Sequence, residues 1–108
     1  MSHEQYQSVI QSLQECMEAC NHCYDACLQE DNVKEMVECI RLGRECADIC
    51  RYLEQTLGRG TPFSKELAKV CAQICQACGN ECNKHDHDHW QKCADACFRC
   101  ADACKSIA

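Results

Sequence analysis

The core-type positions of this chain recur at steps of four, three and four residues, which divides the sequence into four amphipathic segments. In each segment the recurring residue is cysteine, and mostly Glu, Gln, Asp, Ala, Lys and Arg lie between. At about 100° per residue, positions 0, 4, 7 and 11 of a helix form one narrow stripe. A strand would scatter the same residues over both of its faces. The spacing therefore predicts four helices, each with a narrow inward face.

The pattern C-x3-C-x2-C-x3-C occurs four times and accounts for all 15 cysteines, because Gly43 takes one of the slots. Cysteines in this arrangement are candidate metal ligands on the inward faces of the helices. They are Cys16, Cys20, Cys23, Cys27, Cys39, Cys46, Cys50, Cys71, Cys75, Cys78, Cys82, Cys93, Cys97, Cys100 and Cys104.

Turn and capping residues mark where the first two helices begin and end. The first helix is predicted over about residues 4–28. The second begins after Asp31, which has the side chain of an N-cap. It ends near Leu57, before the turn Gly58-Arg59-Gly60.

The remaining connections are equally short. Thr61 is expected to cap the third helix, with Pro62 at its first position and its end near Asn83. Asp86 or Asp88 is expected to cap the fourth. Short connections make successive helices antiparallel, so residues 1–108 are predicted to form one all-α metal-binding domain. Its fold is an antiparallel up-down-up-down four-helix bundle with a cysteine-lined core.

Extending the stripes past the cysteines distinguishes the two ends of the bundle. One end, termed the plug, collects apolar residues: Tyr6, Val9, Leu13, Leu53, Leu57, Phe63, Leu67 and Ile107. The other end, termed the mouth, collects polar residues and soft or borderline ligands: Cys27, Asn32, Met36, Cys39, Cys82, His85, His89 and Cys93.

The cysteines between the two ends are expected to form four layers in a ladder about 16 Å long. From mouth to plug the layers are Cys27/Cys39/Cys82/Cys93, Cys23/Gly43/Cys78/Cys97, Cys20/Cys46/Cys75/Cys100 and Cys16/Cys50/Cys71/Cys104.

Composition and charge exclude several classes of function. The formal net charge is -6 and there are no blocks of Lys or Arg, which argues against nucleic acid as a partner. No apolar run approaches the roughly 20 residues of a membrane span. The opening residues MSHEQYQSVIQSLQE lack the basic and apolar regions of a signal peptide, which predicts a cytoplasmic protein.

In a reducing compartment a dense set of thiols favours metal binding over disulfides. Bridging i to i+3 or i+4 within a helix would also distort the helix. Cysteine can serve as an ordinary core residue, but the chain uses leucine in such slots at the plug. The thiols are therefore interpreted as metal ligands.

Charge favours a monovalent soft ion. Four thiolates around Zn²⁺ leave a site near -2, and several such sites in one dry core would bury much uncompensated charge. One Cu(I) per thiolate is neutral, and soft thiolates select Cu(I). The i,i+4 cysteine pairs leave room for one ion each: 16/20, 23/27, 46/50, 71/75, 78/82, 93/97 and 100/104. Cys39 lacks such a partner because of Gly43, so it is expected to share an ion with another helix or a mouth residue.

The segment HDHDH gives the mouth three histidines. His85 and His89 fall on the inward stripes, and His87 lies between them. They are candidate metal ligands of an uptake port, and a solvated polar loop is the competing interpretation. Met36 is assigned to packing, and His22 points away from the stripe.

Other functions fit less well. The spacing Cys16-x3-Cys20-x2-Cys23 matches that of radical iron–sulfur enzymes, but it recurs here within helices and is interpreted as accidental. A metallothionein-like zinc buffer is the main alternative. A copper chaperone would carry only one or two exposed, exchangeable ions, which fits poorly with 15 inward-facing thiols. No enzyme constellation is present, so the chain is not expected to be an enzyme.

The segments EACNHC, CYDAC, VCAQIC, ACGNEC, KCADAC and RCADAC resemble the helix motifs of the bacterial copper storage proteins. The resemblance covers nearly the whole chain and is closest to the cytosolic branch of the family. It implies a cysteine-lined four-helix bundle holding many Cu(I) ions, a homotetramer, and a mouth with non-cysteine ligands that include histidine. Gly43 departs from the fullest members. The expected function is cytosolic storage and sequestration of Cu(I).

Overall fold

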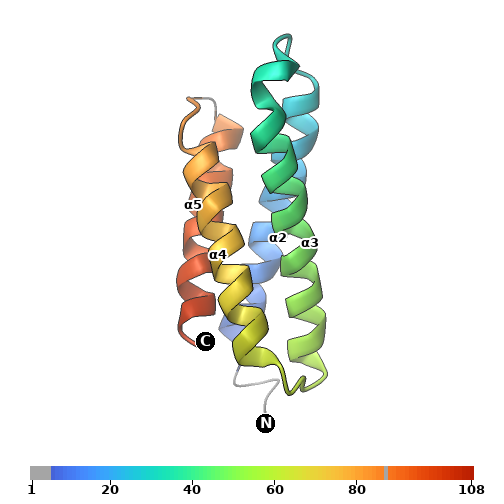
Figure 1. Cartoon of the computed structure of the whole chain (residues 1–108), viewed down its shortest axis with the longest axis vertical. Helices are drawn as coiled ribbons and strands as arrows, with labels where there is room; N and C mark the ends of the chain where they lie inside the picture. Colours follow the sequence, from blue (N-terminus) through green and yellow to red (C-terminus); the bar gives the residue numbers. More distant parts are fainter. Residues whose placement is uncertain (1–5, 87) are drawn as a thin grey trace.

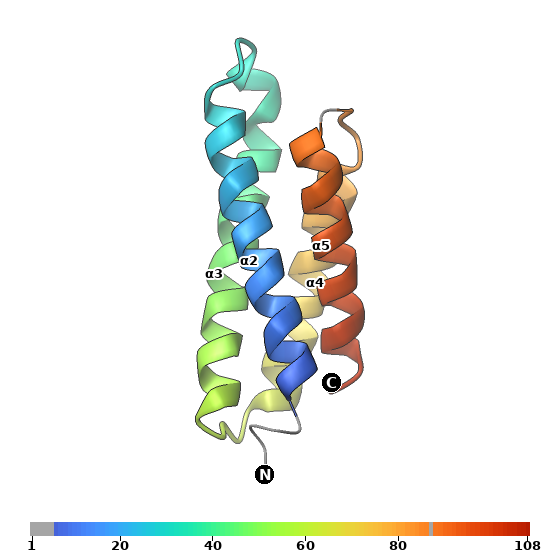
Figure 2. The same cartoon turned by 180° about the vertical axis from the view of Figure 1, so that it is seen from behind.

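The computed structural model describes residues 6–86 and 88–108, which fold into four long helices and one short 3-10 helix. The long helices are α2 (Gln7–Leu28), α3 (Val37–Gly58), α4 (Ser64–Cys82) and α5 (Asp88–Lys105), and the short helix η1 (Val33–Met36) precedes α3. Successive long helices run antiparallel (Figures 1 and 2). Each packs against two neighbours in the cyclic order α2, α3, α4, α5. The predicted up-down-up-down four-helix bundle is confirmed.

The molecule is a narrow rod, 48 Å long and 18 Å across in both other directions. Charged side chains cover its outside, and several pair along one helix, such as Arg44 with Asp48 at 2.8 Å. Such exposed pairs contribute little to stability, so the inward stripe is what holds the helices together. Among the described residues, no helix combines the length and apolarity needed to cross a membrane.

Two of the predicted helix starts are wrong by a few residues. Asp31 does not cap α3, because η1 comes between them and the residue before α3 is Met36. α4 begins at Ser64 rather than at Pro62. Thr61 nevertheless supports this turn, because its hydroxyl accepts the backbone N–H of Phe63 at 3.0 Å. Gly60 provides the reversal before it with a φ of 73°, a conformation that favours glycine.

The apolar plug forms where it was predicted, with one exception. Val9, Leu13, Leu53 and Leu57 are buried, and Tyr6, Leu67 and Ile107 pack against them. Phe63 does not belong to the plug, because 60% of its surface is exposed. It precedes the first residue of α4, so it lies outside the helical stripe from which it was extrapolated.

The two hairpins of the bundle are unequal. α2 and α3 have 22 residues each, whereas α4 has 19 and α5 has 18. The α2–α3 connection consequently extends past the α4–α5 connection at the mouth end (Figure 1).

Candidate metal site

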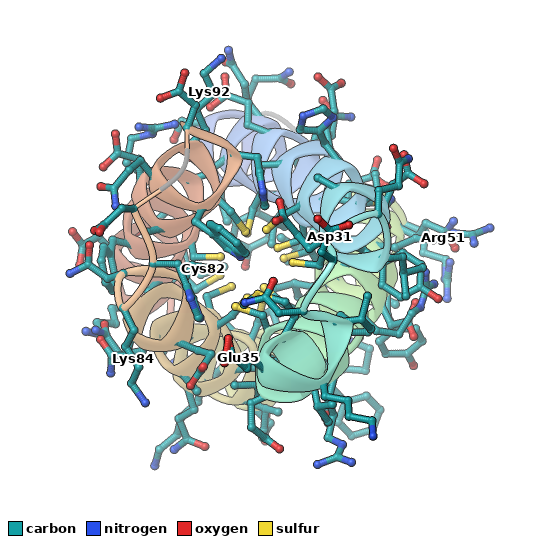
Figure 3. All side chains as sticks on the ribbon, turned by 90° about the horizontal axis from the view of Figure 1, so that it is seen from above. Asp31, Glu35, Arg51, Cys82, Lys84 and Lys92 are labelled. Atoms are coloured by element: carbon teal, nitrogen blue, oxygen red, sulfur yellow. The ribbon has the colours of Figure 1, made fainter. Side chains whose placement is uncertain are left out.

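The cysteine stripes of all four helices face the axis of the bundle. All 15 cysteines are buried, and none takes part in a disulfide. Seen along the axis, the sulfur atoms gather in the space between the ribbons, with Cys82 near the centre, while Arg51, Lys84 and Lys92 point outward (Figure 3). The interior is therefore a column of buried thiols, and the charged side chains lie on the outside of the bundle.

Sulfur atoms from different helices lie within contact distance of one another. The Sγ atoms of Cys46 and Cys75 are 3.6 Å apart, and those of Cys20 and Cys97 are also 3.6 Å apart. Cys16 and Cys46 approach to 3.7 Å. Within single helices, the predicted i,i+4 pairs 23/27, 71/75 and 93/97 have their Sγ atoms 3.9 to 4.0 Å apart.

The thiols form clusters whose sulfur atoms all lie within 4.8 Å of one another. From mouth to plug these clusters include Cys23/Cys82/Cys93, Cys20/Cys78/Cys93/Cys97, Cys16/Cys20/Cys46/Cys97, Cys16/Cys46/Cys50/Cys75 and Cys50/Cys71/Cys75/Cys100. Each cluster shares at least one sulfur with the next. We term this series the shared-sulfur chain.

The shared-sulfur chain corrects the predicted layers at the contact between α2 and α5. Cys97 lies against Cys16 and Cys20 rather than against Cys23. Cys93 lies against Cys20 at 3.7 Å rather than at the level of Cys27. The prediction assumed that all four helices meet at matching levels, whereas α5 is displaced towards the plug relative to α2. Between α3 and α4 the predicted layers hold, as the 4.0 Å approach of Cys50 and Cys71 shows.

Trp90 takes the position at the mouth that the prediction gave to a fourth cysteine. Its side chain is only 2% exposed, and its indole offsets part of the rise that burial causes in the pKa of Cys27. Trp90 is not among the residues predicted for the mouth, although its spacing gave a signal. Trp90 precedes Cys93 by three residues and therefore continues the stripe of α5.

The structure brings two of the three candidate histidines to the mouth. His89 Nδ1 lies 3.3 Å from Cys23 Sγ. His85 Nε2 is buried without a hydrogen-bond partner in the described part of the chain, 3.7 Å from a carboxylate oxygen of Glu81. His87 lies outside the described residues. His22 is exposed, as predicted, and Met36 is buried at the mouth as the packing assignment expects.

The environment of the thiols determines their protonation. Burial raises the pKa of Cys27 above its ordinary value, because a thiolate is poorly solvated there. Hydrogen bonds from Cys23 and Cys39 lower the pKa of Cys82 to about 5, so the column favours a thiolate at this position near the mouth. Most other thiols of the column are held protonated by their neighbours and by burial, as for Cys46 and Cys97.

This arrangement suits many small soft cations better than a few divalent ones. A set of separate tetrahedral Zn²⁺ sites needs four thiolates each and leaves each site near -2. Here consecutive clusters share sulfurs, and the described core offers no cationic side chain to balance such charge. Two- or three-coordinate monovalent ions bridged by shared thiolates keep the interior close to neutral.

Comparison with known proteins places this site in a family. A family model described as copper storage protein matches residues 2–108. An uncharacterized cysteine-rich protein of Bacillus subtilis, YhjQ, is 52% identical over 106 residues, which cover 97% of this chain and 98% of the relative.

Solved structures agree with this match. The Cu(I)-bound copper storage protein BsCsp3 is 50% identical, with a TM-score of 0.92 over 95% of this chain and 97% of that one. A cytosolic copper storage protein from Streptomyces lividans, described with five coppers, is 36% identical, with a TM-score of 0.93 over 98% of this chain and 93% of that one.

Proposed function

This chain belongs to the copper storage protein family, and we propose that it stores Cu(I) on the thiolates of its 15 core cysteines. The observation that carries the proposal is the shared-sulfur chain, which runs from the mouth towards the plug. Its thiols lie close enough to bridge neighbouring ions, and the Cu(I)-bound relative has the same fold.

Capacity follows from charge neutrality. One Cu(I) per thiolate leaves no net charge in the core, which corresponds to roughly 15 ions per chain. All 15 cysteines are proposed as ligands, together with His85, His87 and His89 at the mouth. Because most thiols begin protonated, each ion bound releases a proton, and copper affinity decreases as the pH falls.

The bundle is proposed to be folded before any copper arrives. The plug buries Leu13, Leu53 and Leu57 completely, and each long helix packs against two neighbours. This separates the chain from a metallothionein-like zinc buffer, which would gain its structure from the metal. Circular dichroism of the reduced, metal-free protein is expected to show a helical spectrum.

The cellular setting is proposed from the relatives and from the family resemblance. The Streptomyces lividans relative is described as cytosolic, and we propose the same location for this chain. The family's role is storage, and we propose that this member has no catalytic activity. A homotetramer is also proposed, and the exposed apolar side chains of Tyr52 on α3 and Val70 on α4 offer surface for it. Size-exclusion chromatography with light scattering would measure the mass of the assembly in solution.

The proposed function is tested by anaerobic titration of the reduced apo protein with Cu(I) in competition with a chromophoric chelator. We expect roughly 15 ions per chain to be bound before the chelator colours. Two variants sharpen the count. Cys20→Ala removes a sulfur shared by two clusters and should lower the capacity by one or two ions. Met36→Leu keeps the packing and should leave the capacity unchanged.

Binding of only one to four copper ions would reject storage. A parallel titration with Zn²⁺ addresses the alternative. If the protein held three or four Zn²⁺ more firmly than it holds copper, the zinc buffer would replace the copper store.

A further inference from the structure

A groove runs along the outside of the bundle between α2 and α5, next to the mouth. Two cavities of about 620 and 500 Å³ open along it, and both are lined by His22, His89 and Lys92. We term this region the lateral groove. A third cavity of about 290 Å³ opens at the mouth itself. It adjoins the lateral groove at Glu30 and Asp86, but it is lined by His85 and Trp90 instead of His22 and His89. The two histidines of the mouth thus line different cavities.

Trp90 packs against both histidines of the mouth. Its indole packs against His85 with ring centroids 4.6 Å apart, and against His89 with centroids 4.2 Å apart. The indole is 2% exposed. A bulky, buried ring therefore packs against both imidazoles, and His89 lines the lateral groove.

His89 connects the lateral groove to the thiols. Its Nδ1 lies 3.3 Å from Cys23 Sγ, and its Nε2 lies 3.7 Å from a carboxylate oxygen of Glu30. Cys23 in turn forms the first cluster of the shared-sulfur chain with Cys82 and Cys93. A metal ion on this imidazole is thus one ligand exchange away from three buried sulfurs.

The remaining walls of the lateral groove favour a cation. Glu30, Asp86 and Asp88 line one of its cavities, and Glu15 and Glu18 line the other, against the single positive charge of Lys92. Carboxylates in a hollow raise the local concentration of cations but do not select a soft one. Imidazole nitrogen is a good ligand for copper, so His22 and His89 supply the selectivity.

We infer that the lateral groove is a second copper port, in which His22 and His89 take up Cu(I) and pass it to Cys23. The inference rests on the proposed function and adds a route and a new ligand, His22, to it. In the transfer, the bonds from copper to the imidazole nitrogens break and a bond to Cys23 Sγ forms. The proton of the Cys23 thiol is released to solvent water, and copper stays in the +1 state throughout.

The test is the rate of loading, followed anaerobically by stopped-flow through the near-ultraviolet absorbance of Cu(I)–thiolate bonds. Cu(I) is supplied as its acetonitrile complex to the full-length reduced apo protein. Four variants are compared: His22→Ala, His85→Ala, the double variant, and Asn21→Ala as a matched control. Asn21 is an exposed neighbour of His22 on α2 that does not line the lateral groove.

We expect His22→Ala to load severalfold more slowly than Asn21→Ala and to reach the same final number of ions. The effect should be larger in the His85→Ala background, where the cavity at the mouth has lost its histidine. If His22→Ala loads as fast as Asn21→Ala, and the double variant as fast as His85→Ala, the second port is rejected. A low final count in the unmodified protein would instead reject the storage function, so the two failures are distinguishable.

Discussion

Two glycines at the helix–helix contacts of the bundle should respond in opposite ways to the same substitution. Gly43 in α3 and Gly79 in α4 are both buried within helices. A Cβ at Gly43 would meet only the carbonyl oxygen of Cys20, at an ordinary distance of 3.8 Å. A Cβ at Gly79 would lie 2.6 Å from a ring carbon of Phe98 in α5. The two glycines therefore allow the same substitution to be compared at two sites of one core.

The magnitudes follow from these contacts. Replacing a mid-helix glycine by alanine favours folding by about 1 kcal/mol, because the unfolded chain loses conformational freedom. At Gly43 nothing opposes this gain, so Gly43→Ala should raise the free energy of unfolding by about 1 kcal/mol. At Gly79 the Phe98 ring has to move, and overpacking of this kind costs about 1–3 kcal/mol. Gly79→Ala should therefore range from about neutral to about 2 kcal/mol destabilising.

Urea unfolding of the reduced apo protein, followed by circular dichroism, measures both values. The Phe98→Ala background isolates the contact, because removing the ring should turn Gly79→Ala into a stabilising change. The coupling energy between the two positions is then expected to be about 1–3 kcal/mol. If Gly79→Ala were as stabilising as Gly43→Ala with Phe98 present, the close approach of α4 and α5 described here would be wrong.

Further predictions concern capacity, uptake, the plug and pH. Gly43→Cys fills the missing slot of the repeat, where a Cβ has room, and should raise the copper count by about one ion in the chelator titration. Replacing His85, His87 and His89 together by alanine should slow loading in stopped-flow while most of the capacity stays, and an unchanged rate would remove the histidines from uptake. Leu13→Ala at the fully buried plug should lower the free energy of unfolding of the apo protein by about 2–5 kcal/mol, and an intact copper count would separate stability from binding. Because burial raises the pKa of Cys27 above its ordinary 9.0, the unfolded chain ionises first. The free energy of unfolding of the apo protein should thus be highest below pH 9.0 and decrease as the pH rises above that value. The free energy of unfolding of the copper-loaded protein should not change over the same range.

The helix count, the inward stripes and the plug were predictable because residue spacing is a local property. The fifteen cysteines that the period of the helix assigned to the core are all buried. The relative height of α5 was not predictable in the same way. It depends on how far each hairpin extends, and a helical stripe gives the direction of a side chain but not the level at which it meets another helix.

Two aromatic residues, Phe63 misassigned to the plug and Trp90 not assigned at all, show the same limit from both sides. Phe63 fits the stripe of α4 when the helix is extrapolated past its start, but α4 begins at the next residue and the ring is exposed. Trp90 continues the stripe of α5 three residues before Cys93, yet only the histidines beside it were predicted to line the mouth. The helix period predicted correctly which residues face the core within each helix. At the helix ends, the prediction depended on where the helix begins.

The closed apolar end of the bundle has a consequence for the order in which copper is returned. Fully buried leucines stand at the plug, while the cavities beside the first thiol cluster lie at the opposite end. Ions that advance from sulfur to sulfur along one narrow column can leave only at the mouth end, where the mouth cavity and the lateral groove both open. The copper ion bound last is then released first, and the ions bound earliest, next to the plug, are released last.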